Sequence, residues 1–285
     1  MANSLAACIS KVDWAKEHRD RLADHIRKLF AVESNYPSVR MEFDAHASAY
    51  VFKVSHLPTT LAPARERASL MIGDIVHGLR GALDYLAVRI FLHDSPGNRI
   101  GSEAAQKIQF PIIRKAQDWP SVPNNVLQGV SGQHAGMIER FQPYNRLGLD
   151  EPIDTYVHPL EILNVISNAD KHRCPPLVMI DVMGVQPTAA GKPVFEAIHR
   201  QVRSALAAGG GAGVNGFLLS GKPIELGTEV SRITIPGAAP QPDVDMAGYV
   251  IPQIAFDDSK RNVVPVIDRI AEYVLQIIRD FEPRI

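Results

Sequence analysis

Apolar residues recur at helical spacing in several stretches of this chain. In the longest, residues 64–92, a rotation of about 100° per residue gathers Ile72, Val76, Leu79 and Leu83 on one broad face. The same periodicity predicts amphipathic helices at residues 12–32, 133–141, 155–172 and 263–281. The chain is therefore expected to have a mainly helical framework.

Alternation of apolar and polar residues predicts strands elsewhere. A small β-hairpin is expected at residues 39–44 and 49–54, and residues 108–113 read as a short strand or extended segment. Beyond residue 176, β-like patterns occupy residues 177–182, 216–220, 230–235 and 249–256. Helical and β runs segregated along the chain are typical of the α+β class and not of a doubly wound fold.

The predicted architecture is a helical bundle-like N-terminal part with a small β-hairpin, followed by an antiparallel sheet and a C-terminal helix. Residues 1–175 form the mainly helical part that carries the candidate site, and residues 176–285 form the antiparallel β part with its closing helix. The pattern does not decide whether these parts are two domains or one.

Composition places the chain among ordinary globular proteins. Apolar residues make up 46% and charged residues 21%, so the chain is too apolar for disorder, and a formal charge of −1 supplies no overall basic field for nucleic acid or anionic membrane. The two cysteines suggest no disulfide framework, and no run of about 18 apolar residues predicts a transmembrane helix. We therefore expect a cytoplasmic protein without a membrane partner.

A hydrophilic stripe runs along the predicted 64–92 helix, opposite its apolar face. It contains Asp74, His77, Arg80, Gly81 and Asp84. Glycine is a poor helix former, so glycines beside polar residues indicate that another backbone or a ligand comes close. The alternative interpretation is an ordinary i, i+4 ion pair between Arg80 and Asp84, with His77 satisfied by protein contacts.

A second hydrophilic stripe lies on the predicted 155–172 helix. Glu161, Asn164, Asn168 and His172 fall within about 60° of one another, and Lys171 flanks them. Asparagine is unfavourable in helices, and a buried amide needs hydrogen-bond partners. The cations Lys171, His172 and Arg173 at the helix end have two interpretations: favourable interaction with the macrodipole, or an anion or phosphate site.

These residues resemble the motifs of an uncharacterised bacterial protein family. Its His-x-x-Arg-x-Ala-Leu-Asp motif matches His77 to Asp84, and its Asn-x-Asp-Lys-His-Arg motif matches Asn168 to Arg173. Phe110-Pro111-Ile112 and Gln142-Pro143-Tyr144 fit as well, so the likeness covers residues 72–173. The family brings no known activity with it.

A more distant resemblance is to HEPN domains, helical bundles that often act as RNases in bacterial toxin and defence systems. Asn168 and His172 keep the Asn-to-His spacing of their motif, but Ser167 stands where the family has arginine. The resemblance implies metal-independent RNA cleavage in a homodimer. His172 would be the general acid/base, Asn168 would orient it, and Arg173 or Arg80 would contact the phosphate.

Three hypotheses follow. The first, which we take forward, is a binding or scaffold protein with a polar cleft between two helices, in which His77, Asp84, Asn164, Glu161 and Lys171 are the binding residues. The second is the HEPN-like RNase, with RNA as partner. The third is a metal-dependent hydrolase whose metal ligands are His77, His172, Asp170 and either Asp74 or Asp84. No compact metal-ligand motif is present in the sequence. No cofactor or metal site is predicted, and whether the protein is an enzyme stays open.

Overall fold

The computed structural model describes residues 5–145, 157–171, 178–187, 189, 191–209, 213–215, 225–238, 248–256 and 262–285. Its fold is α+β, as the sequence predicts. The chain divides into two compact units: a helical unit of Met1–Ala23, Ser69–Pro176 and Val264–Ile285, and a sheet unit of Asp24–Ala68 and Leu177–Val263.

The two units are not consecutive in the sequence. The chain passes from one to the other after residues 23, 68, 176 and 263, and the predicted division at residue 175 corresponds only to the third of these passages. The hairpin belongs with strands from the last third of the chain, whereas the final helix belongs to the helical unit. Local periodicity identifies strands and helices but does not identify their distant partners.

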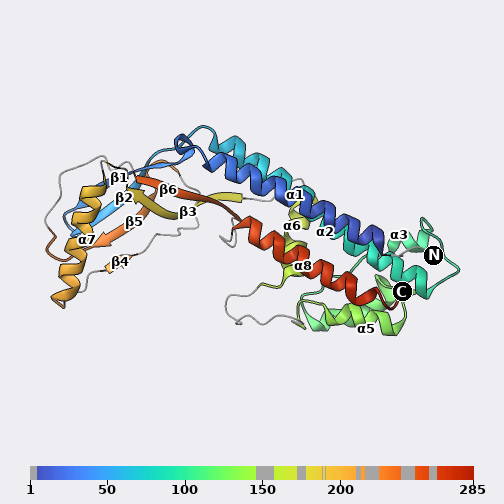
Figure 1. Cartoon of the computed structure of the whole chain (residues 1–285). Coiled ribbons are helices and arrows are strands. Elements are labelled where there is room, and N and C mark those ends of the chain that lie inside the picture. The colour runs from blue at the N-terminus through green and yellow to red at the C-terminus, as the bar shows by residue number, and fades with distance from the viewer. Residues whose placement is uncertain are drawn as a thin grey trace. The chain divides into compact units, whose positions relative to one another are not determined.

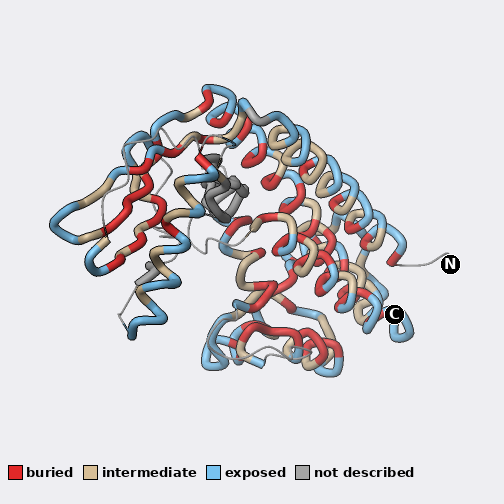
Figure 2. The backbone as a smooth tube through the Cα atoms, turned by 60° about the vertical axis from the view of Figure 1, so that its left-hand side comes forward, coloured by how far each residue is buried: buried red, intermediate tan, exposed pale blue. Residues whose placement is uncertain are grey.

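Five long helices supply residues to the helical unit. They are α1 (Ala6–Phe30), α2 (Leu61–Asp94), α5 (Gly132–Arg140), α6 (Pro159–Lys171) and α8 (Val263–Phe281). The parts of α1 and α2 in this unit run antiparallel and side by side (Figure 1). Buried residues follow one side of each long helix, as amphipathic periodicity requires (Figure 2). None of the described helices is long and apolar enough to cross a bilayer.

Shorter elements connect these helices. They are α3 (Glu103–Lys107), the 3-10 turn η2 (Ala116–Ser121) and the single turn α4 (Val122–Asn125). The predicted helix at residues 263–281 coincides with α8, and α2 exceeds its predicted range by three residues at the start and two at the end. Ser131 caps α5 by accepting the His134 N–H.

Two glycines of α2, Gly81 in the hydrophilic stripe and Gly78 next to His77, mark the approach of α1. A Cβ added at Gly78 would lie 3.5 Å from the Ala15 Cβ, and one added at Gly81 would lie 3.4 Å from Lys11 Nζ. From the sequence we expected either another backbone or a ligand close to these glycines. The neighbour is α1, a helix of the same unit.

The described strands form one six-stranded antiparallel sheet of order β3-β6-β1-β2-β5-β4. Their bounds are β1 (Ser38–Asp44), β2 (Ala49–His56), β3 (Val178–Pro187), β4 (Gly213–Asn215), β5 (Glu229–Thr234) and β6 (Gly248–Phe256). The predicted hairpin is β1–β2, at the centre of the sheet. The predicted strand at residues 216–220 lies outside the described residues.

One face of the central strands is apolar and is covered by α7 (Lys192–Ala207), a helix that the sequence analysis did not predict. Ile198 of α7 is fully buried against Met41, Phe52 and their apolar neighbours on the sheet. Helix α7 has helical spacing in Val194, Ile198 and Val202, but its many polar residues make the pattern less evident than in α8.

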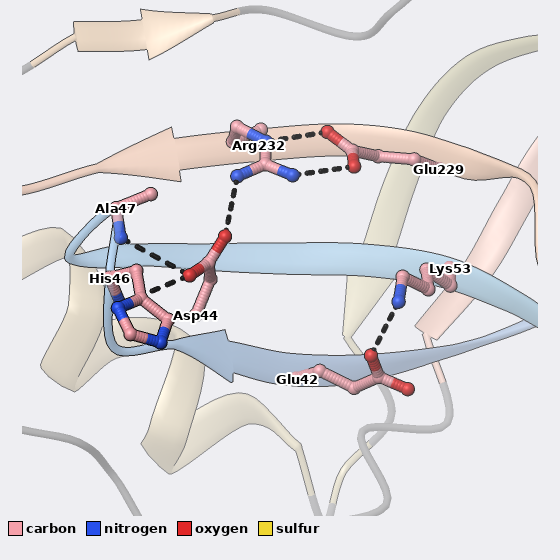
Figure 3. A network of polar contacts seen from close by, with 7 residues as sticks. All are labelled: Glu42, Asp44, His46, Ala47, Lys53, Glu229 and Arg232. Carbon is pink, nitrogen blue, oxygen red and sulfur yellow. Dashed lines mark hydrogen bonds and ion pairs between the residues drawn. The ribbon is translucent and has the colours of Figure 1, made fainter.

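The opposite face carries a network of charged residues (Figure 3). Asp44 accepts the backbone N–H groups of His46 and Ala47 at the hairpin turn and pairs with Arg232 on β5 at 3.1 Å. Arg232 also donates twice to Glu229, at 2.7 and 2.8 Å. The network connects the hairpin turn to β5. Its carboxylates are paired with a guanidinium group of the same protein.

The sheet unit is expected to lose stability as the pH falls below about pH 4. The Ala47 N–H and the Arg232 guanidinium hold the pKa of Asp44 below its ordinary value, and Arg232 lowers the pKa of Glu229. A carboxyl group whose pKa is depressed in the folded state stabilises above its unfolded pKa, and this contribution is lost as the pH falls through the folded value.

Thermal unfolding measured by circular dichroism between about pH 7 and about pH 3 tests this expectation. The Arg232→Gln variant removes the cation that both carboxylates contact, so its melting temperature should depend less steeply on pH than that of the wild type. Equal slopes for the two proteins would contradict the assignment.

Candidate functional site

The hydrophilic stripe of α2 binds the backbone of Phe110. Arg80 Nη2 donates to the Phe110 carbonyl at 2.6 Å and lies 3.0 Å from Asp84 Oδ1. The same Asp84 oxygen accepts the Phe110 N–H at 3.0 Å. The i, i+4 ion pair considered from the sequence is therefore present, and it also satisfies both backbone polar groups of a residue in a non-helical stretch.

Phe110 belongs to an extended stretch, residues 108–114, which we call the central segment. Residues 108–113 have neither helical nor strand pairing, so their backbone groups need partners from side chains. Gln142, fully buried after the end of α5, supplies one: its Oε1 accepts the Ile113 N–H at 2.8 Å, while its Nε2 donates to the Ile138 carbonyl. Thus Gln142, from the Gln142-Pro143-Tyr144 run, also holds the central segment.

The stripe of α6 contacts the same segment through an ion pair between Glu161 and Arg114. Arg114 is mostly exposed and Glu161 is half-buried, so this pair is expected to contribute little to stability. The two stripes thus reach one segment from two helices: Arg80 and Asp84 bind near its middle, and Glu161 binds at its end.

The other predicted site residues make fewer contacts. His77 and Asp74 are exposed on α2, and neither has a hydrogen bond or ion pair to another described residue. On α6, Asn164 is half-buried and Asn168 is exposed in the last turn. The exposed amide of Asn168 can be solvated by water, so it needs no partner within the protein.

Three predicted site residues have side chains outside the described part of the structure. Lys171 is the last residue of α6, and its side chain is outside the described part of the structure, as are His172 and Arg173 altogether. The geometry that the HEPN resemblance implies around His172 therefore stays a prediction.

A buried histidine that the sequence analysis missed fixes the start of α6. His158 Nδ1 accepts the Leu160 N–H at 3.1 Å, and Nε2 lies 3.1 Å from the Tyr273 hydroxyl on α8. Because Nδ1 accepts, Nε2 carries the proton and donates to Tyr273, whose hydroxyl donates to the Phe141 carbonyl. A lone histidine next to proline gives no such signal in the sequence, since Tyr273, which its Nε2 contacts, lies 115 residues further along the chain.

Among the described residues, no group of three or more His, Cys, Asp or Glu side chains is arranged to hold a metal ion. Asp170 and His172, two residues of the metal hypothesis, have no described side chains. The acidic residue Asp84 is engaged by Arg80 and Phe110.

Comparisons with protein-family models, with curated proteins and with solved structures give no match to this chain. The contacts to the central segment are therefore the observations from which its function is inferred.

Proposed function

We propose that this chain is a binding or scaffold protein in which the hydrophilic stripes of α2 and α6 hold the central segment, and not an enzyme that uses Arg80 and Asp84. The observation that carries the proposal is the joint binding of the Phe110 carbonyl and N–H by these two residues. A general acid or base must be free to exchange a proton with a substrate, whereas Asp84 Oδ1 already accepts two hydrogen-bonding groups.

The other contacts of the central segment support the same proposal. Gln142 is fully buried and uses its amide oxygen and its amide nitrogen on backbone groups of the protein. Glu161 is paired with Arg114. The residues that resemble family motifs and have described contacts thus stabilise the helical unit. The exposed His77 and Asn168 remain accessible to a binding partner.

A second candidate function is the HEPN-like RNase. It is favoured by one observation, the exposure of Asn168 in the last turn of α6 without a bond to another described residue. In this proposal His172 is the general acid/base that moves the proton, Asn168 orients His172, and Arg173 contacts the phosphate. Arg80 is less suited to the phosphate, because its Nη2 is engaged by Phe110 and Asp84.

Incubation of the purified protein with structured RNA in EDTA separates the two candidates. If the protein is a scaffold, the RNA stays intact, or any cleavage is no faster with the wild-type protein than with the His172→Ala variant. A nuclease cleaves it, with a loss of at least about 100-fold on removal of the general acid/base in His172→Ala. The His77→Ala variant is the matched control, since it removes an exposed histidine that neither mechanism uses for proton transfer.

A further inference from the structure

A hollow of about 280 Å³ lies beside the second half of α2 in the helical unit. Its walls are mostly apolar and come from three places in the chain. They include Tyr85, Val88 and Arg89 of α2, Ile100 in the following loop, and Ala105 and Gln106 of α3. Ile100 is 67% exposed and Tyr85 is 48% exposed. Single exposed apolar residues are common, but here two of them line the same hollow.

One cation lines the hollow and a second lies over the ring of a lining residue, and neither has a carboxylate partner among the described residues. Arg89 is half-buried, and it has no hydrogen bond or ion pair to any other described residue. Lys11 places its ammonium group 4.5 Å from the centre of the Tyr85 ring, and it has no acidic partner in the described part of the chain. Among the described residues, no Asp or Glu lines the hollow.

An unpaired guanidinium at an apolar wall is an unusual arrangement. Three other half-buried arginines have carboxylate partners: Arg80 pairs with Asp84, Arg19 with Asp268, and Arg232 with Asp44 and Glu229. Electrostatic attraction is stronger beside apolar surface than in bulk water, so an anion that reaches Arg89 is held more firmly than at an open surface. The hollow thus combines apolar walls with an excess of positive charge.

We propose that this hollow binds a small organic carboxylate, whose anionic group pairs with Arg89 and whose apolar body lies against Tyr85, Val88 and Ile100. A guanidinium matches a carboxylate through two parallel hydrogen bonds. A volume of about 280 Å³ is at the lower end for ligand sites, which suits a medium-chain or monocyclic acid better than a nucleotide. This site is separate from the residues that hold the central segment, so it goes beyond the function proposed above.

Calorimetric titration of the full chain with octanoate, and with the neutral octanamide, tests the proposal. We expect octanoate to bind at one site and octanamide to bind at least about tenfold more weakly, because the amide loses the charge-assisted pair. Equal affinities, or no binding of octanoate, would overturn the proposal. This comparison uses only the wild-type protein, so it does not depend on the folding of a variant.

Two variants locate the site. Arg89→Met keeps an apolar stem but removes the charge, and it should weaken octanoate binding by about tenfold while leaving octanamide binding unchanged. Arg99→Met is the matched control, because Arg99 is exposed in the neighbouring loop and does not line the hollow. Octanoate affinity that is unchanged in Arg89→Met, or lowered equally in both variants, would refute the role given to Arg89.

Discussion

The Asp94→Ala variant is expected to lose about 3 kcal/mol of unfolding free energy, because it breaks a buried charge-assisted contact. Asp94 is the last residue of α2, and its Oδ2 accepts the Ser131 N–H at 2.7 Å. His134 Nδ1 lies 2.8 Å from Asp94 Oδ1, and both side chains are only 8% exposed. Removal of the carboxylate leaves both groups buried without their acceptor.

The ionisation of Asp94 adds a pH dependence to this contact. Burial by itself raises the pKa of Asp94, but hydrogen bonds from Ser131 and His134 outweigh it and hold the pKa below its ordinary value. The contribution of this carboxylate is therefore present above its unfolded pKa and is lost as the pH falls through the folded value. A helix C-terminus disfavours a negative charge, so the hydrogen bonds are what keep Asp94 ionised there.

Urea denaturation followed by circular dichroism measures the change. The matched control is Asp74→Ala, which removes an exposed aspartate from the same helix and should change stability by less than about 0.5 kcal/mol. Asp94→Asn keeps one acceptor oxygen and should lie between the two. If Asp94→Ala were as stable as Asp74→Ala, the contact could not hold α2 to the start of α5.

The second large effect is expected at Asp84. Replacement of Asp84 by alanine should lower the unfolding free energy by about 2 kcal/mol, since the Phe110 N–H and Arg80 Nη2 lose the same acceptor. The expected loss is smaller than at Asp94, because the Asp84 side chain is 31% exposed and water can replace part of the contact. Arg80, only 12% exposed, is left as a poorly compensated cation.

A double-mutant cycle with Arg80→Met tests whether Arg80 and Asp84 act as one unit. The double variant removes the uncompensated cation that Asp84→Ala leaves behind, so its loss of stability should be smaller than the sum of the two single losses. Additive losses would mean that each residue contacts Phe110 independently. Asp74→Ala serves again as the reference for a change that touches no partner.

Both predictions give α2 the same role. Its carboxylates bind backbone N–H groups of non-helical residues, Phe110 through Asp84 and Ser131 through Asp94. Each contact spans more than 25 positions in sequence, with separations of 26 and 37. The helix therefore stabilises non-helical segments whose backbone groups have no partners in regular secondary structure.

Parts of the candidate site could be predicted and parts could not. The i, i+4 spacing of Arg80 and Asp84 predicts their ion pair, because neighbours on a helix face are fixed by helical geometry. The same spacing placed Asn164 and Asn168 on one stripe of α6, but Asn164 is half-buried and Asn168 is exposed, because the burial of each position depends on the neighbouring elements. His158 was missed because its partner Tyr273 is 115 residues away.

The sequence by itself determined the α+β class, the extent of α8 and the central hairpin, because these depend on periodicity and turn residues within short windows. Only the tertiary structure decided that β1 pairs with β6, that β2 pairs with β5, and that Arg80 and Asp84 bind Phe110. These contacts join residues far apart in the chain. Their partners follow from packing of the whole fold, which no local pattern of hydrophobic and polar residues records.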